Sequence, residues 1–348
     1  MESGIGMELS NQGIGGEREI LSILKQNRMH SAEAHPLLQI FARDYEKYVE
    51  TGVTPQSGYA ALRQLYFGTR GRFDETIQNL YRKTFPPTPV DTSSSVLAGE
   101  LGFTGLDEIT SELQQMGMYR FKTRVPVPFI EDLNQVLDAS SGKDRMGNRL
   151  VEDVTTQQMM KSVRVARLAT DPLLVAIAQG YLGSQVILDS AQAWVSRPGE
   201  YGNEELSKGA MMYHMDKDRL AFLKVFLYLS DVDDTAGPHH FIQGTHKNIP
   251  DPLWKEGRMS DEEVYEHLPA TGHRVEGPAG TLFLVDTSGL HRGSRPTERE
   301  RRLFQVTFAS SLFGHPYPPF AINRTSLFQL RLRARQYGPR FMDRFTNS

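Results

Sequence analysis

The sequence has no cysteine among its 348 residues. This absence excludes disulfide bonds, thiolate zinc sites, iron–sulfur clusters and cysteine nucleophiles, and it favours a reducing cytoplasm. There is no apolar run near the roughly 20 residues that a membrane helix needs, and the N-terminal stretch does not resemble a signal peptide. The net charge of −3 is small, so electrostatics favours neither nucleic acid nor a membrane surface. We therefore expect a cytoplasmic protein with neither of these partners.

Helical patterns occupy the first part of the chain and strand patterns the second. Residues 1–17 are polar and glycine-rich, which predicts disorder, and residues 18–95 predict a helical extension that ends in the linker "PPTPVDTSSS". Further on, apolar strands separated by Gly/Pro turns predict an antiparallel sandwich or barrel. We predict a mainly β domain with flanking helices over residues 96–325, followed by a basic C-terminal helix in residues 326–348. No internal repeat is visible.

One long polar segment interrupts the strand region. Residues 247–274, "KNIPDPLWKEGRMSDEEVYEHLPATGHR", carry Trp254 and Tyr265 among many polar residues. Because long loops inside compact domains are often functional, we predict that this insert forms a lid or a wall of the substrate site.

A histidine and an aspartate stand two residues apart in "YHMDKDRL". His214 and Asp216 directly precede the apolar, β-prone stretch "AFLKVFLYLS", and side chains two apart in an extended chain lie on one face. Chance alone gives about one His-x-acid triplet in a chain of this composition, so the spacing is suggestive only through its place at the mouth of a strand.

A second histidine, His291, lies at the end of another predicted strand, "GTLFLVDTSGLH". Two histidines and one carboxylate on one face of a metal leave the opposite positions open, which is the arrangement of non-haem Fe(II) oxygenases. Eleven residues later comes Arg302, whose planar guanidinium suits bidentate recognition of a carboxylate. Together these residues predict a site for a 2-oxo acid that chelates the metal at one end and pairs with arginine at the other.

The order of "YHMD", "FLKVFLYLSDVDDTAGPHHFIQGTH", "GPAGTLFLVDTSGLHRG" and "RRLFQVTF" resembles the phytanoyl-CoA dioxygenase family of Fe(II)/2-oxoglutarate oxygenases. The resemblance covers about residues 105–315. It implies a double-stranded β-helix (jelly-roll) core, Fe(II) held by His214, Asp216 and His291, and O₂ and 2-oxoglutarate as co-substrates.

The resemblance also implies residues that bind 2-oxoglutarate. The family pairs the co-substrate with an arginine after the distal histidine, which by counted offset is Arg302, with Arg301 as the alternative because adjacent strand residues face opposite sides. The family often adds a polar residue from the first core strand, for which Gln192 is the first candidate and Ser196 the second. The expected activity is hydroxylation, or else desaturation, of a small-molecule substrate whose identity the sequence does not indicate.

Other readings of these residues and of the fold remain open. The imidazoles of His239, His240 and His246 are interpreted as structural, and Lys224 either reaches the cofactor or substrate or extends to solvent. The alternatives for function are a cupin-like metalloenzyme without a keto acid and a non-catalytic metal- or sugar-binding β-sandwich. Neither alternative needs the buried arginine, so the position of Arg302 separates them from the oxygenase.

Overall fold

The computed structural model describes residues 15–26, 35–139, 143–145, 148–268, 272–322 and 324–347. The predicted disordered segment 1–17 lies mostly outside these ranges, but residues 15–26 form helical backbone, so the end of that segment is helical. Within the described ranges, no helix combines the length and the apolar character that crossing a membrane requires.

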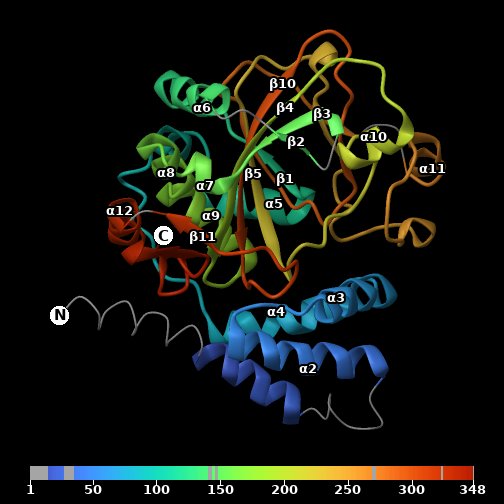
Figure 1. Ribbon diagram of the computed structural model, residues 1–348, viewed down its shortest axis with the longest axis vertical. Coiled ribbons are helices and arrows are strands. Elements are labelled where there is room, and N and C mark those ends of the chain that lie inside the picture. The colour runs from blue at the N-terminus through green and yellow to red at the C-terminus, as the bar shows by residue number, and fades with distance from the viewer. Residues whose placement is uncertain are drawn as a thin grey trace.

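Three predicted N-terminal helices are present and form a layer of their own, which we call the N-terminal layer. They are α2 (Pro36–Thr51), α3 (Gln56–Thr69) and α4 (Arg72–Thr84). Pro36 begins α2 and Gly52 ends it in the left-handed conformation that glycine adopts without strain. In Figure 1 the layer lies beneath the ends of the strands. Its aromatic core takes in Phe313 from the far end of the chain, so the layer is packed onto the β region.

The largest sheet, called here the major sheet, has seven strands in the order β1-β8-β5-β10-β4-β3-β2. All its neighbours are antiparallel. Its strands are β1 (Met118–Arg120), β2 (Lys143–Arg145), β3 (Asn148–Val154), β4 (Ile187–Ser196), β5 (Phe222–Tyr228), β8 (Leu282–Val285) and β10 (Arg301–Ala309).

A second antiparallel sheet, the minor sheet, has the order β7-β6-β9. Its strands are β6 (His239–Phe241), β7 (His273–Val275) and β9 (His291–Gly293). An isolated bridge between His214 and His291 adds the segment around residue 214 to its edge. Along the chain, β4, β5, β8 and β10 belong to the major sheet, and the segments between them, around residue 214, at β6–β7 and at β9, belong to the minor sheet. The chain therefore crosses repeatedly between the two sheets.

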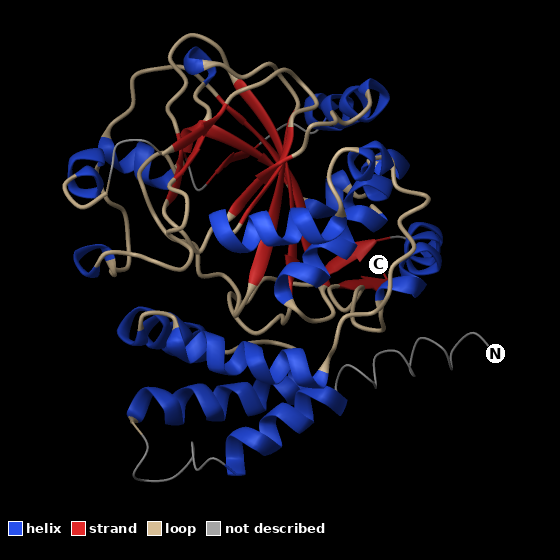
Figure 2. Cartoon of the chain, turned by 180° about the vertical axis from the view of Figure 1, so that it is seen from behind, coloured by secondary structure: helices blue, strands red, loops and turns tan. Residues whose placement is uncertain are grey.

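Helices cover one face of the major sheet, and the minor sheet faces the other. Val225, Leu227, Phe304 and Val306 point to the helical side and share one apolar cluster with the helices. We call this side the outward face, and the side toward the minor sheet the inward face. The covering helices are α5 (Leu106–Met116), α6 (Val127–Ala139), α7 (Thr156–Met159), α8 (Val163–Ala169) and α9 (Pro172–Leu182). Figure 2 shows helices in front of these strands when the molecule is seen from behind. Gly183 ends α9 in the left-handed conformation.

Several elements differ from the sequence-based expectations. More residues lie in helices than in strands, so "mainly β" fits the core and not the described chain as a whole. The hairpin of β2 and β3 was not predicted, because its sequence is charged and lacks clear alternation. The linker at 86–95 is held against α9, since the Thr88 amide donates to Gln179 and the Ser95 hydroxyl donates to Asp171.

The C-terminal helix is shorter than predicted. It is α12 (Arg324–Ala334), and Gly338 and Pro339 follow soon after it and prevent its continuation. The remaining elements are η1 (Ala98–Gly102), α10 (Asn203–Lys208), η2 (Asp234–Ala236), η3 (Asp251–Leu253), α11 (Asp261–Tyr265), β11 (Phe320–Ile322), η4 (Arg335–Tyr337) and β12 (Phe345–Asn347).

The insert at 247–274 is built into the fold over its described residues. It contains η3, α11 and the start of β7, and it buries Leu253, Met259 and Val264. Met259 exchanges two backbone hydrogen bonds with Tyr213, at 2.9 and 3.1 Å. The insert thus packs beside the segment that carries His214, and its role as a lid or wall of the substrate site stays a prediction.

Candidate metal centre

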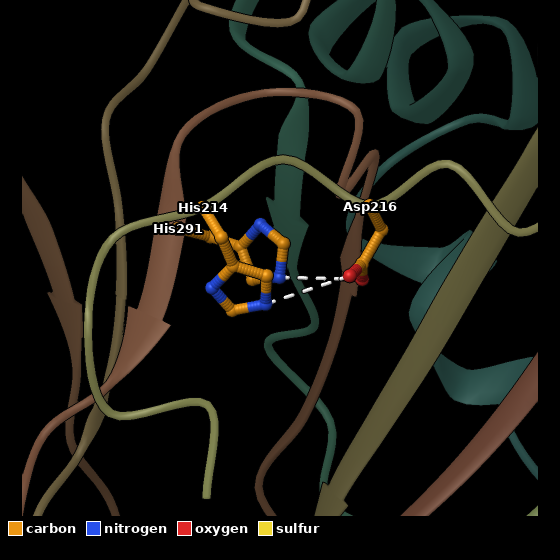
Figure 3. Close-up of side chains that lie close together, drawn as sticks. All are labelled: His214, Asp216 and His291. Atoms are coloured by element: carbon orange, nitrogen blue, oxygen red, sulfur yellow. Dashed lines mark ion pairs between the residues drawn. The ribbon is translucent and has the colours of Figure 1, made fainter. Parts of the chain in front are cut away.

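His214, Asp216 and His291 come together between the two sheets. His214 and His291 exchange backbone hydrogen bonds of 3.0 and 3.1 Å, and their rings lie with centroids 4.2 Å apart. The Asp216 amide donates to the Thr287 carbonyl at 2.8 Å, which turns the carboxylate toward both rings (Figure 3). One potential ligand atom from each residue lies within 4.8 Å of the others.

Backbone carbonyls fix the orientation of both imidazoles. Nδ1 of His214 lies 2.9 Å from the Met212 carbonyl, and Nδ1 of His291 lies 3.0 Å from the Gly289 carbonyl. Because a carbonyl only accepts, each Nδ1 carries a proton, and Nε2 is the nitrogen that can offer a lone pair to a metal. The two Nε2 atoms face the Asp216 carboxylate at 3.4 and 3.3 Å.

The protonation states of His214 and Asp216 match those that metal binding needs. Burial, with a further contribution from His291, lowers the pKa of His214 to about 4, so its ring is neutral near pH 7. Burial by itself would raise the pKa of Asp216, but Lys224 and the two histidines hold that pKa well below its usual range. Two imidazoles and one carboxylate on one side form a donor set that fits Fe(II).

Charged neighbours hold the segment around Asp216 in place from both sides. Lys217, the next residue, points into the N-terminal layer, where its ammonium pairs with Asp74 of α4 and lies 4.5 Å from the Tyr66 ring centroid. Arg219 pairs with the buried Asp189 at 2.8 Å. Since Lys217 and Arg219 are nearly fully buried, these ion pairs resist rotation of the segment and fix the direction in which Asp216 points.

The structure excludes one of the two roles considered for Lys224, extension to solvent, and leaves the contact with cofactor or substrate a prediction. It lies on the inward face of β5, and its ammonium donates to Asp216 Oδ2 at 2.6 Å. The Asp218 carboxylate lies 3.9 Å from the same ammonium. Lys224 therefore supports a ligand carboxylate and does not extend to solvent, since its side chain is only 10% exposed.

Arg302 lies on the wrong side of β10 for the role predicted for it. Its guanidinium donates to Glu300 and Asp138, each at 2.7 Å, on the outward side of the sheet. The placement of Arg302 beside the metal is therefore corrected: the side chain that enters the space between the sheets is that of Arg301.

Arg301 is a buried cation, and among the described residues no carboxylate pairs with it. One terminal nitrogen donates to the Gly237 carbonyl, and the other lies 3.4 Å from the Ser196 hydroxyl. Its Nε is buried and has no hydrogen-bond partner in the described part of the chain. A Cβ on Gly293 would lie 2.6 Å from the guanidinium, so glycine leaves the room that this side chain occupies. Burial lowers the pKa of Arg301. Such a cation is costly unless an anion accompanies it.

The candidates on the first core strand lie on the same inward face. Gln192 of β4 stands opposite Gln305 in the ladder and is half-buried, while Ser196 contacts Arg301. The role of Gln192 in binding the co-substrate stays a prediction.

The three histidines interpreted as structural behave differently from one another. His240 lies 2.5 Å from the Tyr213 hydroxyl, and His246 lies 3.1 Å from the Gln114 carbonyl, which suits structural roles. His239 instead stacks beside His291, with ring centroids 5.7 Å apart, and its Nε2 is buried and unpaired among the described residues. Alternation along "HHF" indicates that only one of the two adjacent histidines faces inward, and in the structure it is His239.

Comparisons with known proteins were made against families, curated proteins and solved structures. A sequence profile of the family "Phytanoyl-CoA dioxygenase (PhyH)" matches residues 98–303, which is more than half of the chain. No curated protein matches.

Solved structures with similarity include three enzymes. One is the non-heme alpha ketoglutarate dependent epimerase SnoN from nogalamycin biosynthesis, with 18% identity, a TM-score of 0.46, and 59% of this chain and 82% of that one covered. A second is the carbocyclase SnoK from the same biosynthesis, with 17% identity and a TM-score of 0.45. The similarity covers 58% of this chain and 83% of that one. A third is HygX from Streptomyces hygroscopicus with nickel and 2-oxoglutarate bound, with 18% identity and a TM-score of 0.45. The similarity covers 63% of this chain and 92% of that one.

Proposed function

The chain belongs to the phytanoyl-CoA dioxygenase family, and from this premise we propose that it hydroxylates a small-molecule substrate. Enzymes of this family use Fe(II), 2-oxoglutarate and O₂, and these are the cofactor and co-substrates of this chain. The N-terminal layer precedes the matched region, which begins at residue 98.

The proposed fold of the matched region is a double-stranded β-helix (jelly roll), within the domain proposed for residues 96–325. The support is the strand order: β8-β5-β10-β4 in one sheet, and β7-β6-β9 with the bridged segment at residue 214 in the other. Successive segments cross between the sheets, as they do when a pair of antiparallel strands winds into a roll. In such a roll the ligands lie between the sheets, where the three candidate metal ligands are.

We assign Fe(II) to His214, Asp216 and His291, and the distal carboxylate of 2-oxoglutarate to Arg301. The observation that carries the proposal is the buried Arg301 guanidinium, which has no carboxylate partner among the described residues and lies on the inward face of the sheet. A cupin-like enzyme without a keto acid has no use for such a cation. Gln192 stays a candidate for a further contact to the co-substrate.

The side chains and backbone of the protein bind the metal and the co-substrate, orient them, and exclude water from the site. With iron and the keto acid bound, O₂ is converted to an oxidant that breaks a substrate C–H bond while 2-oxoglutarate gives succinate and CO₂. The carbonyls of Met212 and Gly289 keep both imidazole lone pairs directed at the metal. Lys224 steadies the Asp216 carboxylate. The apolar side chains of Phe226 and Phe283 keep bulk water from the space between the sheets.

Asp216 bears on the reaction type. Its carboxylate takes the coordination position that a halide would need, so we propose hydroxylation first, desaturation second and no halogenation. The substrate stays open, and a metabolite screen scored by succinate release is the way to find it.

The test is spectroscopic and needs no substrate. Purified protein with Fe(II) and 2-oxoglutarate, without O₂, should give the weak visible charge-transfer band of a metal-bound keto acid. Asp216→Ala should lose it, whereas Asp251→Ala, a change at an exposed carboxylate of the insert, should keep it. No band from the unmodified protein, at saturating Fe(II) and 2-oxoglutarate, would refute the proposal. With a substrate in hand, ¹⁸O₂ should place label in the product.

A further inference from the structure

His239 occupies an unusual position for a histidine that is not a metal ligand. It is on β6, opposite Gly293 of β9 in the minor sheet, and its side chain is 5% exposed. Its ring lies between the His291 ring, 5.7 Å away, and the Phe226 ring of the major sheet, 4.9 Å away. The side chain thus spans the space between the two sheets, beside the candidate metal centre.

One ring nitrogen of His239 is buried and lacks a hydrogen-bond partner among the described residues. Nε2 of His239 is buried and finds no partner in the described part of the chain. A buried polar atom without a partner lowers stability, so a protein seldom keeps one where an apolar side chain would fit. The neighbours Phe226 and Phe283 would accept a leucine here. The unpaired Nε2 therefore indicates a place where a ligand could supply the partner.

Arg301, which lies nearby, also has a buried nitrogen that lacks a hydrogen-bond partner among the described residues. Its Nε is also buried and unpaired within the described ranges. Both residues border Gly293: the backbone of His239 pairs with it across the ladder, and the Arg301 guanidinium fills the space where its Cβ would be. Arg301 also donates to the carbonyl of Gly237, two residues before His239. Two buried nitrogens without a partner in the described part of the chain thus lie near one another beside the candidate metal centre.

The order of the groups indicates which part of a ligand they contact. The His239 ring stacks on the metal-ligand ring of His291 on one side, and its backbone stands next to the Arg301 guanidinium on the other. A keto acid that chelates the metal and ends at Arg301 passes His239 before it reaches the arginine. A carboxylate has four lone-pair directions and accepts from both residues at once.

We propose that His239 Nε2–H donates a hydrogen bond to the distal carboxylate of 2-oxoglutarate, as a second anchor beside Arg301. This inference rests on the proposed function. The carboxylate selects the ring tautomer with its proton on Nε2, so the ring needs no charge for this role. Recognition by two groups makes the protein selective for 2-oxo acids with two carboxylates over those with one.

The experiment compares two keto acids. The Fe(II) protein is titrated without O₂ with 2-oxoglutarate and with 2-oxovalerate, which lacks the distal carboxylate, and the visible band gives each dissociation constant. His239→Leu should weaken 2-oxoglutarate binding about 10-fold or more, as expected for a lost hydrogen bond to a charged group, and leave 2-oxovalerate binding within about twofold. His239→Gln, which keeps a donor, should recover part of the affinity for 2-oxoglutarate.

Two controls separate this role from a structural one. Fe(II) stoichiometry is measured on each variant, and His240→Leu serves as the matched variant, because it changes the next residue, which contacts Tyr213 instead. His240→Leu should leave the ratio of the two affinities unchanged. Equal weakening of both keto acids in His239→Leu, or no weakening of either, overturns the inference.

Failure of the inference is distinguishable from failure of the proposed function. If the unmodified protein forms no band with 2-oxoglutarate, the proposed function fails and this inference fails with it. If the unmodified protein and His239→Leu bind 2-oxoglutarate equally while Arg301→Met binds it weakly, the function stands and only the role of His239 is refuted.

Discussion

The two faces of the major sheet are made by the same strands and differ completely in chemistry. On β5 and β10 the outward side chains other than that of Arg302 are apolar, among them Val225, Leu227, Phe304 and Val306, and they pack with the helices. The inward side chains of the same strands include Lys224, Arg301, Gln305 and Thr307, all of which are also buried. The outward face stabilises the fold, whereas the inward face buries polar groups that lower stability unless a ligand pairs with them.

Arg301 and Arg302 show this contrast at adjacent residues. Arg302 has two carboxylate partners at the sheet's outer surface, and Arg301 has none among the described residues. Stability explains the first arginine, and only ligand binding explains the second. Four variants test this division, given from the largest expected effect to the smallest.

Loss of a metal ligand should have the largest effect. His291→Ala removes one of three donors, so the protein should no longer bind one equivalent of Fe(II), while its circular dichroism spectrum stays unchanged. Metal analysis after gel filtration gives the stoichiometry. A variant that retains full Fe(II) occupancy would remove His291 from the metal centre.

Phe304→Ala should damage the outward face alone. Phe304 is 1% exposed, and such a truncation lowers the free energy of unfolding by about 3–5 kcal/mol through lost burial and a cavity. Urea denaturation measures it. Gln305→Ala, the inward neighbour, is the control and should lower it by no more than about 1.5 kcal/mol. If the two variants lost stability equally, the contrast between the faces would be wrong.

Arg301→Met should weaken 2-oxoglutarate binding without unfolding the protein. Loss of one partner of a buried charge pair costs about 2–5 kcal/mol, which is about 30-fold to several thousand-fold in the dissociation constant. Without 2-oxoglutarate the same variant should be more stable than the unmodified protein, because an unpaired buried cation has been replaced by an apolar side chain of similar length. Isothermal calorimetry and urea denaturation supply the two measurements.

Arg302→Met should have the smallest effect. The pairs of Arg302 with Asp138 and Glu300 are partly exposed, with 26% of the arginine side chain accessible, and such pairs contribute about 0–1 kcal/mol to folding. Binding of 2-oxoglutarate should not change. A large loss of 2-oxoglutarate affinity here, with Arg301→Met unaffected, would restore the role first predicted for Arg302.

Local residue patterns predicted the helices of the N-terminal layer and the long strands β4, β5 and β10, because the pattern of each element lies within its own segment of the sequence. The family was predicted correctly and is confirmed by the match over residues 98–303. Short elements were missed: the charged hairpin of β2 and β3 has no apolar alternation, and the three-residue strands β7 and β9 are too short to show any.

The candidate metal ligands were readable because His214 and Asp216 are close in sequence and their residue types suit one metal. Their approach to His291 is a tertiary fact, made by the backbone bridge between residues 214 and 291. The sequence alone offered His291 by its place after a strand, and only the pairing of the two segments brought the imidazoles to a ring separation of 4.2 Å.

The choice between Arg301 and Arg302 was decided by the tertiary structure alone. The next residues, Leu303 inward and Phe304 outward, are both buried and apolar. Since both faces of β10 are covered, alternation along "RRLFQVTF" does not tell which arginine faces the metal. The register with Ser196 and Tyr228 and the space left by Gly293 determine it. The sequence determined that an arginine stands at this strand end. The packing of the two sheets determined which of the two arginines is buried between them without a carboxylate partner among the described residues.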